Sequence, residues 1–358
     1  MMDNRKILVV LTGGTIGSAI TDNTINVSGT SVYRLINEYY REYGECDDFV
    51  IEQPYSILSE NTTLNTWNKL CGYLSDKDFN EYSGIIITHG TDTYSYTAAL
   101  LGLLYDNCID IPMVLVSSNY AIGEPQSNGL NNFANAVSFI RENSSMNEQD
   151  SRYKGVFCIY EDNFGVNCVY KAREIMEADT CTDQFKPFGG QYFGHIEGNH
   201  FVYNTMHENH CCTDLDKRFC SEKHKNVDKK IVFYKEVINI KSYPGLNYEY
   251  IDIEKIQKKK SESEASDIPE GSIKYPAAVL NNAYHSATVC VARGTESFAD
   301  FAKRCSNAGI HVYINGFKRN LKDEYESLKE LDNYHVTRLY DMSPEMAYAY
   351  VLVKENLL

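Results

Sequence analysis

The chain has 358 residues, 43% of them hydrophobic and 23% charged, which is ordinary for a globular protein and long enough for two domains. Its 34 basic and 49 acidic residues give a net charge of −15, which disfavours nucleic acid and anionic membrane as partners. No apolar run approaches the roughly 20 residues that span a bilayer, and no signal-peptide pattern precedes the first apolar run. We therefore expect a cytoplasmic protein whose 11 cysteines stay free.

Strand-like and helix-like segments alternate through the first half of the chain. This alternation is typical of βαβ units and predicts a doubly wound, mainly parallel sheet. The expected strands lie at 7–11, 49–51, 85–88, 113–117 and 156–160, and the expected helices at 31–41, 64–75, 94–105 and 129–141.

A second and smaller set of elements follows residue 230. The expected strands are 231–240, 277–280, 289–292 and 310–314, with helices at 296–307 and 343–354. The preceding stretch is rich in charge, His and Cys and has no periodicity, which indicates a linker. We therefore expect a larger N-terminal domain over residues 1–205, a linker over 206–230, and a smaller C-terminal α/β domain over 231–358.

Two threonine-bearing turns each follow an apolar strand. The first is Thr-Gly-Gly-Thr-Ile-Gly at 12–17, and the second is His-Gly-Thr-Asp-Thr at 89–93. Ligands of open α/β sheets bind at the carboxyl ends of the strands, where glycine lets a small ligand approach the backbone. Neither turn is a phosphate-binding loop, because no lysine follows a second glycine and the glycine spacing differs from G-x-G-x-x-G. The two turns therefore predict a small-molecule site.

This pair of turns resembles the L-asparaginase family of amidohydrolases, whose members carry a TGGTI turn and an HGTDT turn in the same order. The resemblance covers nearly the whole chain, more thinly between about 195 and 230, and the Val-Ser-Gly run at 27–29 is closer to the cytoplasmic subtype. Further matches are Ser59 with Trp67, Ser127-Asn128-Gly129, Tyr243-Pro244-Gly245 and Asp341-Met342-Ser343-Pro344-Glu345. The resemblance implies two α/β domains, a homodimer or homotetramer, no metal or organic cofactor, and an amino-acid amide as substrate.

The resemblance also implies roles for residues of the two turns. Thr15 matches the nucleophile, Thr91 the second catalytic threonine, and Asp92 the carboxylate that binds the substrate's α-amino group. The substrate-binding positions are Gly14, Ser59, Glu60 and Gly90, with Ser59 helping to bind the α-carboxylate. A single Thr-Gly turn is more typical of a helix cap, but two turns in matched context favour a functional site.

The tyrosine that serves the nucleophile in the family has no counterpart here. The aligned position is Thr24, and no tyrosine occurs between Thr15 and Tyr33. Tyr33, Tyr94 and Tyr96 are candidates to replace it, although Tyr94 and Tyr96 fit equally well as packing residues of a helix.

The family lysine that pairs with the second threonine is also missing. Its position falls on Met176, next to Glu177, and the segment at 127–129 lacks the family's carboxylate. Lys171 lies five residues upstream and could substitute if the segment carries a local insertion. Because a positioned base is typically worth 10²–10⁴-fold in rate, its loss would strongly weaken catalysis.

Two further groups of residues are candidates outside the turns. His285 follows a predicted strand of the second domain and could either line the site or bind a backbone carbonyl. A linker cluster of soft ligands could hold zinc, although it lacks a C-x-x-C pair and is more typical of an incidental His/Cys-rich loop. Its members are His207, His210, Cys211, Cys212, Cys220 and His224.

Three functions are compatible with these residues. The first is hydrolysis of the side-chain amide of L-asparagine, or a close relative, to aspartate and ammonia, with Thr15 as the nucleophile. The second is a catalytically silent protein that keeps the amino-acid pocket. The third is an amidase for a larger or modified amide, for which a trimmed N-terminal loop would widen the entrance.

Overall fold

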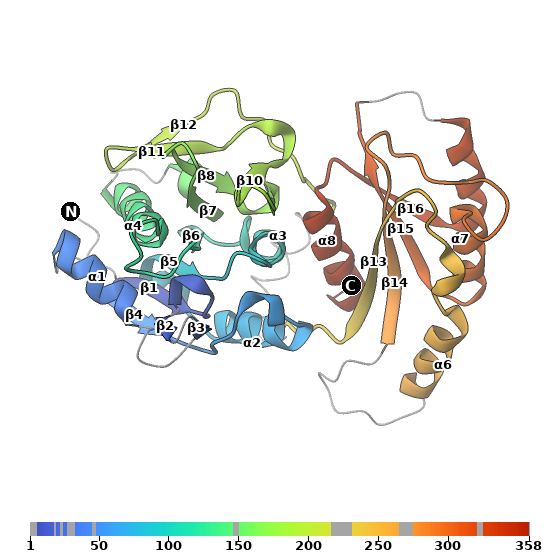
Figure 1. Cartoon of the computed structure of the whole chain (residues 1–358), viewed down its shortest axis with the longest axis horizontal. Coiled ribbons are helices and arrows are strands. Elements are labelled where there is room, and N and C mark those ends of the chain that lie inside the picture. The colour runs from blue at the N-terminus through green and yellow to red at the C-terminus, as the bar shows by residue number, and fades with distance from the viewer. Residues whose placement is uncertain are drawn as a thin grey trace. The chain divides into compact units, whose positions relative to one another are not determined.

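The computed structural model describes residues 6–17, 19–21, 24–26, 33–44, 48–145, 150–215, 231–264, 275–320 and 325–357. The chain divides into two compact units, Met1–Lys230 and Ile231–Leu358 (Figure 1). Each unit has its own sheet covered by helices, which confirms the predicted α/β class with a larger mainly parallel sheet and a smaller second one. Residues 206–215 of the expected linker belong to the first unit.

The first unit is built on an eight-stranded sheet in the order β12-β11-β8-β7-β6-β5-β1-β4. The five strands from β7 to β4 are parallel, and β8, β11 and β12 extend the sheet antiparallel. The strands are β1 Lys6–Leu11, β4 Phe49–Glu52, β5 Tyr82–Thr88, β6 Pro112–Val116, β7 Gly155–Glu161, β8 Asn167–Lys171, β11 Gly194–Glu197 and β12 His200–Tyr203.

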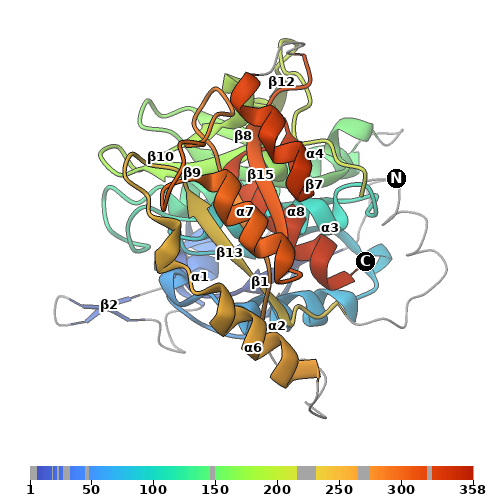
Figure 2. The ribbon, with the colours of Figure 1, turned by 90° about the vertical axis from the view of Figure 1, so that its right-hand side faces the viewer.

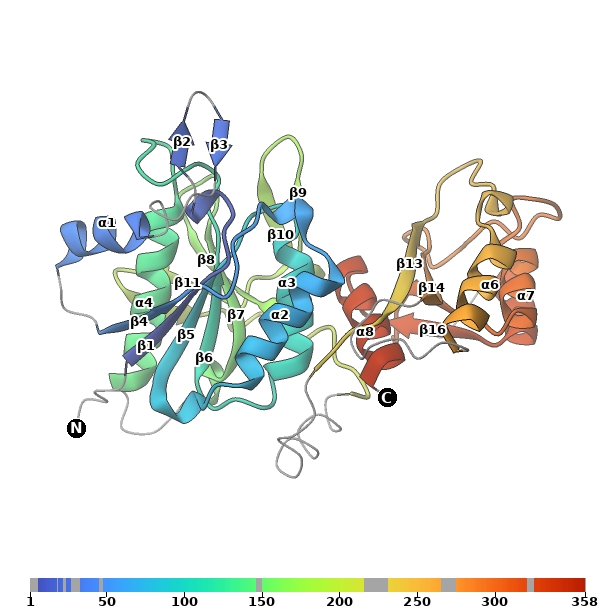
Figure 3. The ribbon, with the colours of Figure 1, turned by 90° about the horizontal axis from the view of Figure 1, so that it is seen from below.

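Four helices cover this sheet, and two hairpins extend from it. Figure 3 shows α1 and α4 on one face and α2 and α3 on the other. The helices are α1 Arg34–Tyr43, α2 Leu64–Ser75, α3 Tyr94–Tyr105 and α4 Gly129–Ser145. The hairpins are β2 Ala19–Thr21 with β3 Thr24–Asn26, and β9 Ile175–Asp179 with β10 Gln184–Pro187.

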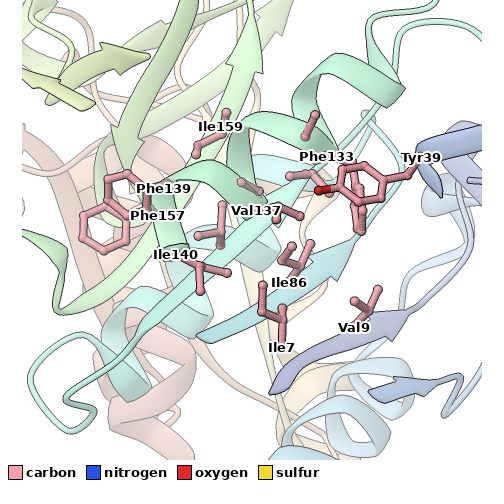
Figure 4. Close-up of a cluster of buried hydrophobic side chains, with 14 of the residues drawn as sticks. Ile7, Val9, Tyr39, Ile86, Phe133, Val137, Phe139, Ile140, Phe157 and Ile159 are labelled. Carbon is pink, nitrogen blue, oxygen red and sulfur yellow. The ribbon is translucent and has the colours of Figure 1, made fainter. Parts of the chain in front are cut away.

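The central strands are apolar along their whole length because helices cover both faces. In β1, the side chains from Ile7 to Val10 are fully buried. Alternate strand residues such as Ile7, Val9 and Ile86 meet Phe133 and Val137 of α4 (Figure 4). This core fixes the strands in register, so the turns that follow β1 and β5 begin at the same level.

The second unit is a parallel four-stranded sheet in the order β13-β14-β15-β16. Helices α6 and α7 lie on the face that Figure 2 presents, and α8 lies on the other. The strands are β13 Lys235–Lys241, β14 Tyr275–Asn282, β15 His311–Phe317 and β16 Val336–Tyr340, and the helices are α6 Ile253–Glu264, α7 Phe298–Asn307 and α8 Pro344–Leu357.

One predicted strand is wrong. Residues 289–292 form a connection without strand pairing. Val289 packs into the core of the second unit, and the carbonyl of Cys290 accepts a hydrogen bond from Phe298 N at the start of α7, at 2.8 Å. The sheet is completed by β16 instead, which was not predicted. Within the part of the chain described above, no helix has both the length and the hydropathy needed to cross a membrane.

Candidate active site at the carboxyl edge of the first sheet

The two threonine-bearing turns start side by side. Strands β1 and β5 are adjacent and parallel, with Leu11 opposite Thr88. The Thr12 hydroxyl donates to the carbonyl of Thr88 at 2.6 Å, and Thr12 N donates to Thr88 Oγ1 at 3.3 Å. Thr12 is buried, so these hydrogen bonds tie the two strand ends together before the chain turns. The sequence interpretation gave Thr12 no role in the site and missed this contact.

The backbones of the two turns touch at Gly14 and Gly90. A Cβ on Gly14 would lie 2.3 Å from Gly90 N and 2.4 Å from Gly90 Cα, and the φ of Gly14 is +75°. Both the space and the backbone conformation therefore require glycine. Thr15 and Thr91 each follow one of these glycines and are half-buried. The two predicted catalytic threonines are thus carried by turns in direct contact.

Ser59 joins both turns from a third segment. It begins a short 3-10 helix, Ser59–Asn61, just after Ile57, which exchanges backbone hydrogen bonds with the first turn. The Ser59 hydroxyl donates to Asp92 Oδ2 at 3.0 Å and accepts from Asp92 N at 3.2 Å. A Cβ on Gly90 would lie 2.5 Å from Ser59 Oγ. Glu60, the next residue, is exposed.

A buried histidine supports the second turn from below. His89 Nε2 lies 3.0 Å from Thr97 Oγ1, which in turn accepts a hydrogen bond from Trp67 Nε1 at 2.9 Å. His89 Nδ1 lies 2.8 Å from the carbonyl of Gly90. A carbonyl only accepts, so Nδ1 carries the proton and the Thr97 hydroxyl donates to Nε2.

This network keeps His89 neutral. Burial lowers the pKa of His89, against the opposing effects of the Gly90 carbonyl and the Asp92 charge. The result is a rigid, uncharged support that fixes the peptide after Gly90. Trp67 was noted only as part of the resemblance, and no sequence signal indicates its contact with Thr97, 30 residues later.

Comparison with known proteins identifies the family. A family model described as "Asparaginase, N-terminal" matches residues 6–209. The chain belongs to the asparaginase family. This confirms the resemblance inferred from the two turns.

Curated relatives of this asparaginase-family chain include amidotransferase subunits as well as asparaginases. It is 26% identical over 257 residues to one subunit of the glutamyl-tRNA(Gln) amidotransferase of Methanosphaera stadtmanae, covering 70% of this chain and 54% of the relative. It is 31% identical over 151 residues to L-asparaginase 1 of Escherichia coli K12, covering 41% and 43%. The chain thus spans about half the length of the curated relatives it matches.

The fold of the thermostable L-asparaginase from Thermococcus kodakarensis is similar over 99% of this chain and 93% of that one, with a TM-score of 0.66 and 19% identity. Membership of the asparaginase family supports amide hydrolysis of asparagine-type substrates as the general reaction. Because amidotransferase subunits occur among the relatives, the family does not fix one substrate.

The loop after β6 meets the asparaginase turns through backbone and amide contacts. Ser117 Oγ donates to the carbonyl of His89 at 2.8 Å. Asn128 Oδ1 accepts from Asn119 N at 3.0 Å, and Asn119 Oδ1 accepts from Asn128 N at 3.1 Å. This reciprocal pair ties the end of β6 to the start of α4. Asn128, which stands where the family has a carboxylate, therefore has a structural role here.

The two positions that depart from the asparaginase pattern lie on the two hairpins. Thr24 begins β3, paired with Thr21 of β2. Met176 lies on β9 opposite Lys186 of β10. The β10 residue Phe185 packs its ring 5.2 Å from Tyr94, which directly follows the second turn. Lys186 pairs with Asp179 at 3.0 Å on the surface.

The candidate tyrosines are not assembled around the turns. Tyr94 is a core residue whose hydroxyl donates to the carbonyl of Leu115 at 2.6 Å. Tyr33 is exposed just before α1. Tyr96 is half-buried on the first turn of α3.

Lys171 does not lie with the two turns. It pairs with Phe157 on the far side of β7, whereas β5, which carries the second turn, is separated from β8 by β6 and β7. At about 4.8 Å per strand, the β5-to-β8 separation is about 14 Å. The substitution of Lys171 for the family lysine is therefore wrong, because its strand does not bring it to the site.

His285 lies in the second unit, exposed on the turn that follows β14. It is not part of the cluster that Gly14, Ser59, Gly90 and Asp92 form within the first unit.

The proposed zinc ligands are engaged differently. His207 Nε2 lies 2.7 Å from Glu174 Oε2, and His210 N donates to Glu174 Oε1 at 2.6 Å. Cys211 is buried and Cys212 is exposed, while Cys220 and His224 lie outside the described residues. Among the residues that are described, no group of three His, Cys, Asp or Glu side chains is arranged to hold a metal ion.

Proposed function

We propose that this chain hydrolyses the side-chain amide of L-asparagine, or a close relative, to aspartate and ammonia. The contact between Gly14 and Gly90 carries the proposal, because it sets the hydroxyl-bearing residues Thr15 and Thr91 on adjoining turns. Family membership supports the same reaction type.

In this proposal Thr15 attacks the amide carbon, and Thr91 with Asp92 orients substrate and water. Asp92 is exposed and its Oδ2 is held by Ser59, so its carboxylate is preorganised for the substrate's ammonium group. Ser59 also lies close enough to both turns to help bind the α-carboxylate. Gly14, Glu60 and Gly90 complete the substrate-binding set.

A second candidate is an amino-acid-binding protein without turnover. It is favoured by Met176, which cannot transfer a proton, at the position of the family lysine. A third candidate is an amidase for a larger amide, supported by the relationship to an amidotransferase. One set of measurements separates the three.

The test is ammonia release from L-asparagine, L-glutamine and the dipeptide glycyl-asparagine, with Thr15→Ala as the test variant. Thr63→Ala is the matched control, because it removes an exposed hydroxyl that caps α2. Turnover of asparagine that disappears only in Thr15→Ala supports the first function. Thermal stabilisation by aspartate without any turnover supports the second, since a ligand of the folded state raises its melting temperature. Turnover of the dipeptide alone supports the third.

We also propose a cytoplasmic homodimer or homotetramer that uses no cofactor. The location is supported by nine free cysteines among the described residues, which is typical of a reducing compartment. The oligomeric state is supported by the family resemblance. Light scattering of the purified chain tests it, and a monomeric mass would contradict it.

A further inference from the structure

A second hollow, of about 400 Å³, opens at the amino edge of the first sheet. It is lined by the loop between α3 and β6, by Ser151 and Lys154 just before β7, by Lys171 to Glu174 after β8, and by residues near His210. The volume lies within the range of small-molecule sites. The turns of the candidate active site leave the opposite, carboxyl edge, so the two hollows are separate.

Each acidic side chain of this hollow already has a partner. Asp110 Oδ1 accepts from Lys154 Nζ at 2.8 Å. Asp106 Oδ1 accepts from Val156 N at 3.0 Å, and its Oδ2 lies 3.5 Å from Arg173 Nε. Both oxygens of Glu174 are engaged, by the His207 ring and by His210 N.

Lys171 differs from the other cations of the lining. Its ammonium lies 4.1 Å from the centre of the Phe157 ring and 4.5 Å from that of Phe193. No hydrogen bond or ion pair joins it to any residue of the described part of the chain. Burial lowers the pKa of Lys171, partly offset by the charges of Asp106 and Glu174. The aromatic faces attract the cation, but they leave it without the oxygen acceptor that a buried ammonium needs.

We propose that this hollow is a binding site for a small carboxylate of charge −1, whose oxygens accept hydrogen bonds from the Lys171 ammonium. The rings of Phe157 and Phe193 and the side chain of Ile109 offer apolar contact to the hydrocarbon part of such a ligand. A dianion such as phosphate fits less well, because the lining already contains three carboxylates. The site is independent of the proposed amide hydrolysis.

The test uses butyrate as the probe and the reactivity of Lys171 as the readout. The full chain is treated briefly with an amine-acylating reagent, and each lysine is quantified by mass spectrometry. We expect millimolar butyrate to slow acylation of Lys171 at least threefold while leaving the exposed Lys258 unchanged. Absence of protection, or equal protection by inorganic phosphate, would overturn the proposal.

A variant gives a second readout. Lys171→Met keeps an unbranched side chain against the two rings and removes the ammonium, so butyrate should no longer raise the melting temperature. Lys186→Met, which removes a surface lysine paired with Asp179, should respond to butyrate like the original chain. Stabilisation that persists in Lys171→Met would contradict the assignment. If that variant does not fold, the labelling result on the unmodified chain decides. Neither readout depends on turnover of an amide.

Discussion

Gly14 and Gly90 are in backbone contact, and this contact positions both threonines of the candidate active site. The two residues lie 76 positions apart in the chain and are brought together because β1 and β5 are neighbours in the sheet. A larger residue at either position must push the turns apart.

The first prediction compares Gly14→Ala with Gly44→Ala. Both glycines have left-handed backbone, with φ of +75° and +84°, but a Cβ on Gly44 meets nothing within 4 Å. Both variants suffer the backbone strain, of about 1 kcal/mol. Gly14→Ala should lose roughly 1–3 kcal/mol more from overpacking, seen in urea unfolding.

The same pair should differ in activity. Because displacement of catalytic groups by about 1 Å can cost 10²-fold, Gly14→Ala should reduce ammonia release about 100-fold, and Gly44→Ala should leave it nearly unchanged. Equal effects of the two substitutions would mean that contact between the turns does not matter for the reaction.

The second prediction concerns Ser59. Ser59→Ala removes both hydrogen bonds to Asp92, and Ser83→Ala removes one hydrogen bond to the carbonyl of Lys6 at the other end of β5. Each variant should lose about 1–2 kcal/mol of stability. Only Ser59→Ala should raise the KM for asparagine, by about tenfold, because Asp92 loses its orientation. A similar rise in KM for Ser83→Ala would attribute the effect to general loosening of the sheet.

Local sequence patterns predicted the parts of the fold that are stabilised locally. Strands such as β1 and β5 are continuous apolar runs because helices cover both faces, and the turns after them are recognisable from their glycines. Thr15 and Thr91 could be paired only through the resemblance, since the contact between their turns depends on strand order.

The rest depended on contacts that a sequence does not display. The apolar run at 289–292 has the composition of a strand, but it packs into the core without a neighbouring strand to pair with. Glu174 and His207 lie 33 residues apart, so nothing in the His/Cys-rich run indicates that a carboxylate binds His207. Lys171 is suitable in chemistry and close in sequence to the family lysine, yet its strand lies on the wrong side of β7.

The third prediction concerns this buried carboxylate. Glu174→Ala leaves His207 and His210 N without their acceptor and should destabilise the first unit by about 3–5 kcal/mol. It should also make residues 206–215 sensitive to protease, because Glu174 holds this segment to the unit. The control is Glu197→Ala, an exposed carboxylate whose contact with His195 is 3.9 Å. Protease resistance in Glu174→Ala would show that other contacts fix the segment.

The fourth prediction is a pH dependence that originates at His89. The pKa of His89 is lowered in the fold, so below about pH 6.5 the unfolded chain takes up a proton that the folded chain does not. Stability should therefore be complete above about pH 6.5 and fall as the pH drops below it, by up to about 1.4 kcal/mol per pH unit from this group. His89→Gln, whose amide can still donate to the Gly90 carbonyl and accept from Thr97, should lack this component.

Tryptophan fluorescence measures this pH dependence directly, because Trp67 is the only tryptophan and lies within the same network as His89. The difference in stability between the original chain and His89→Gln should grow from about pH 6.5 down to about pH 5. His195→Gln, a change at a half-exposed histidine, should follow the original chain. Parallel curves for all three proteins would assign the acid sensitivity to other groups.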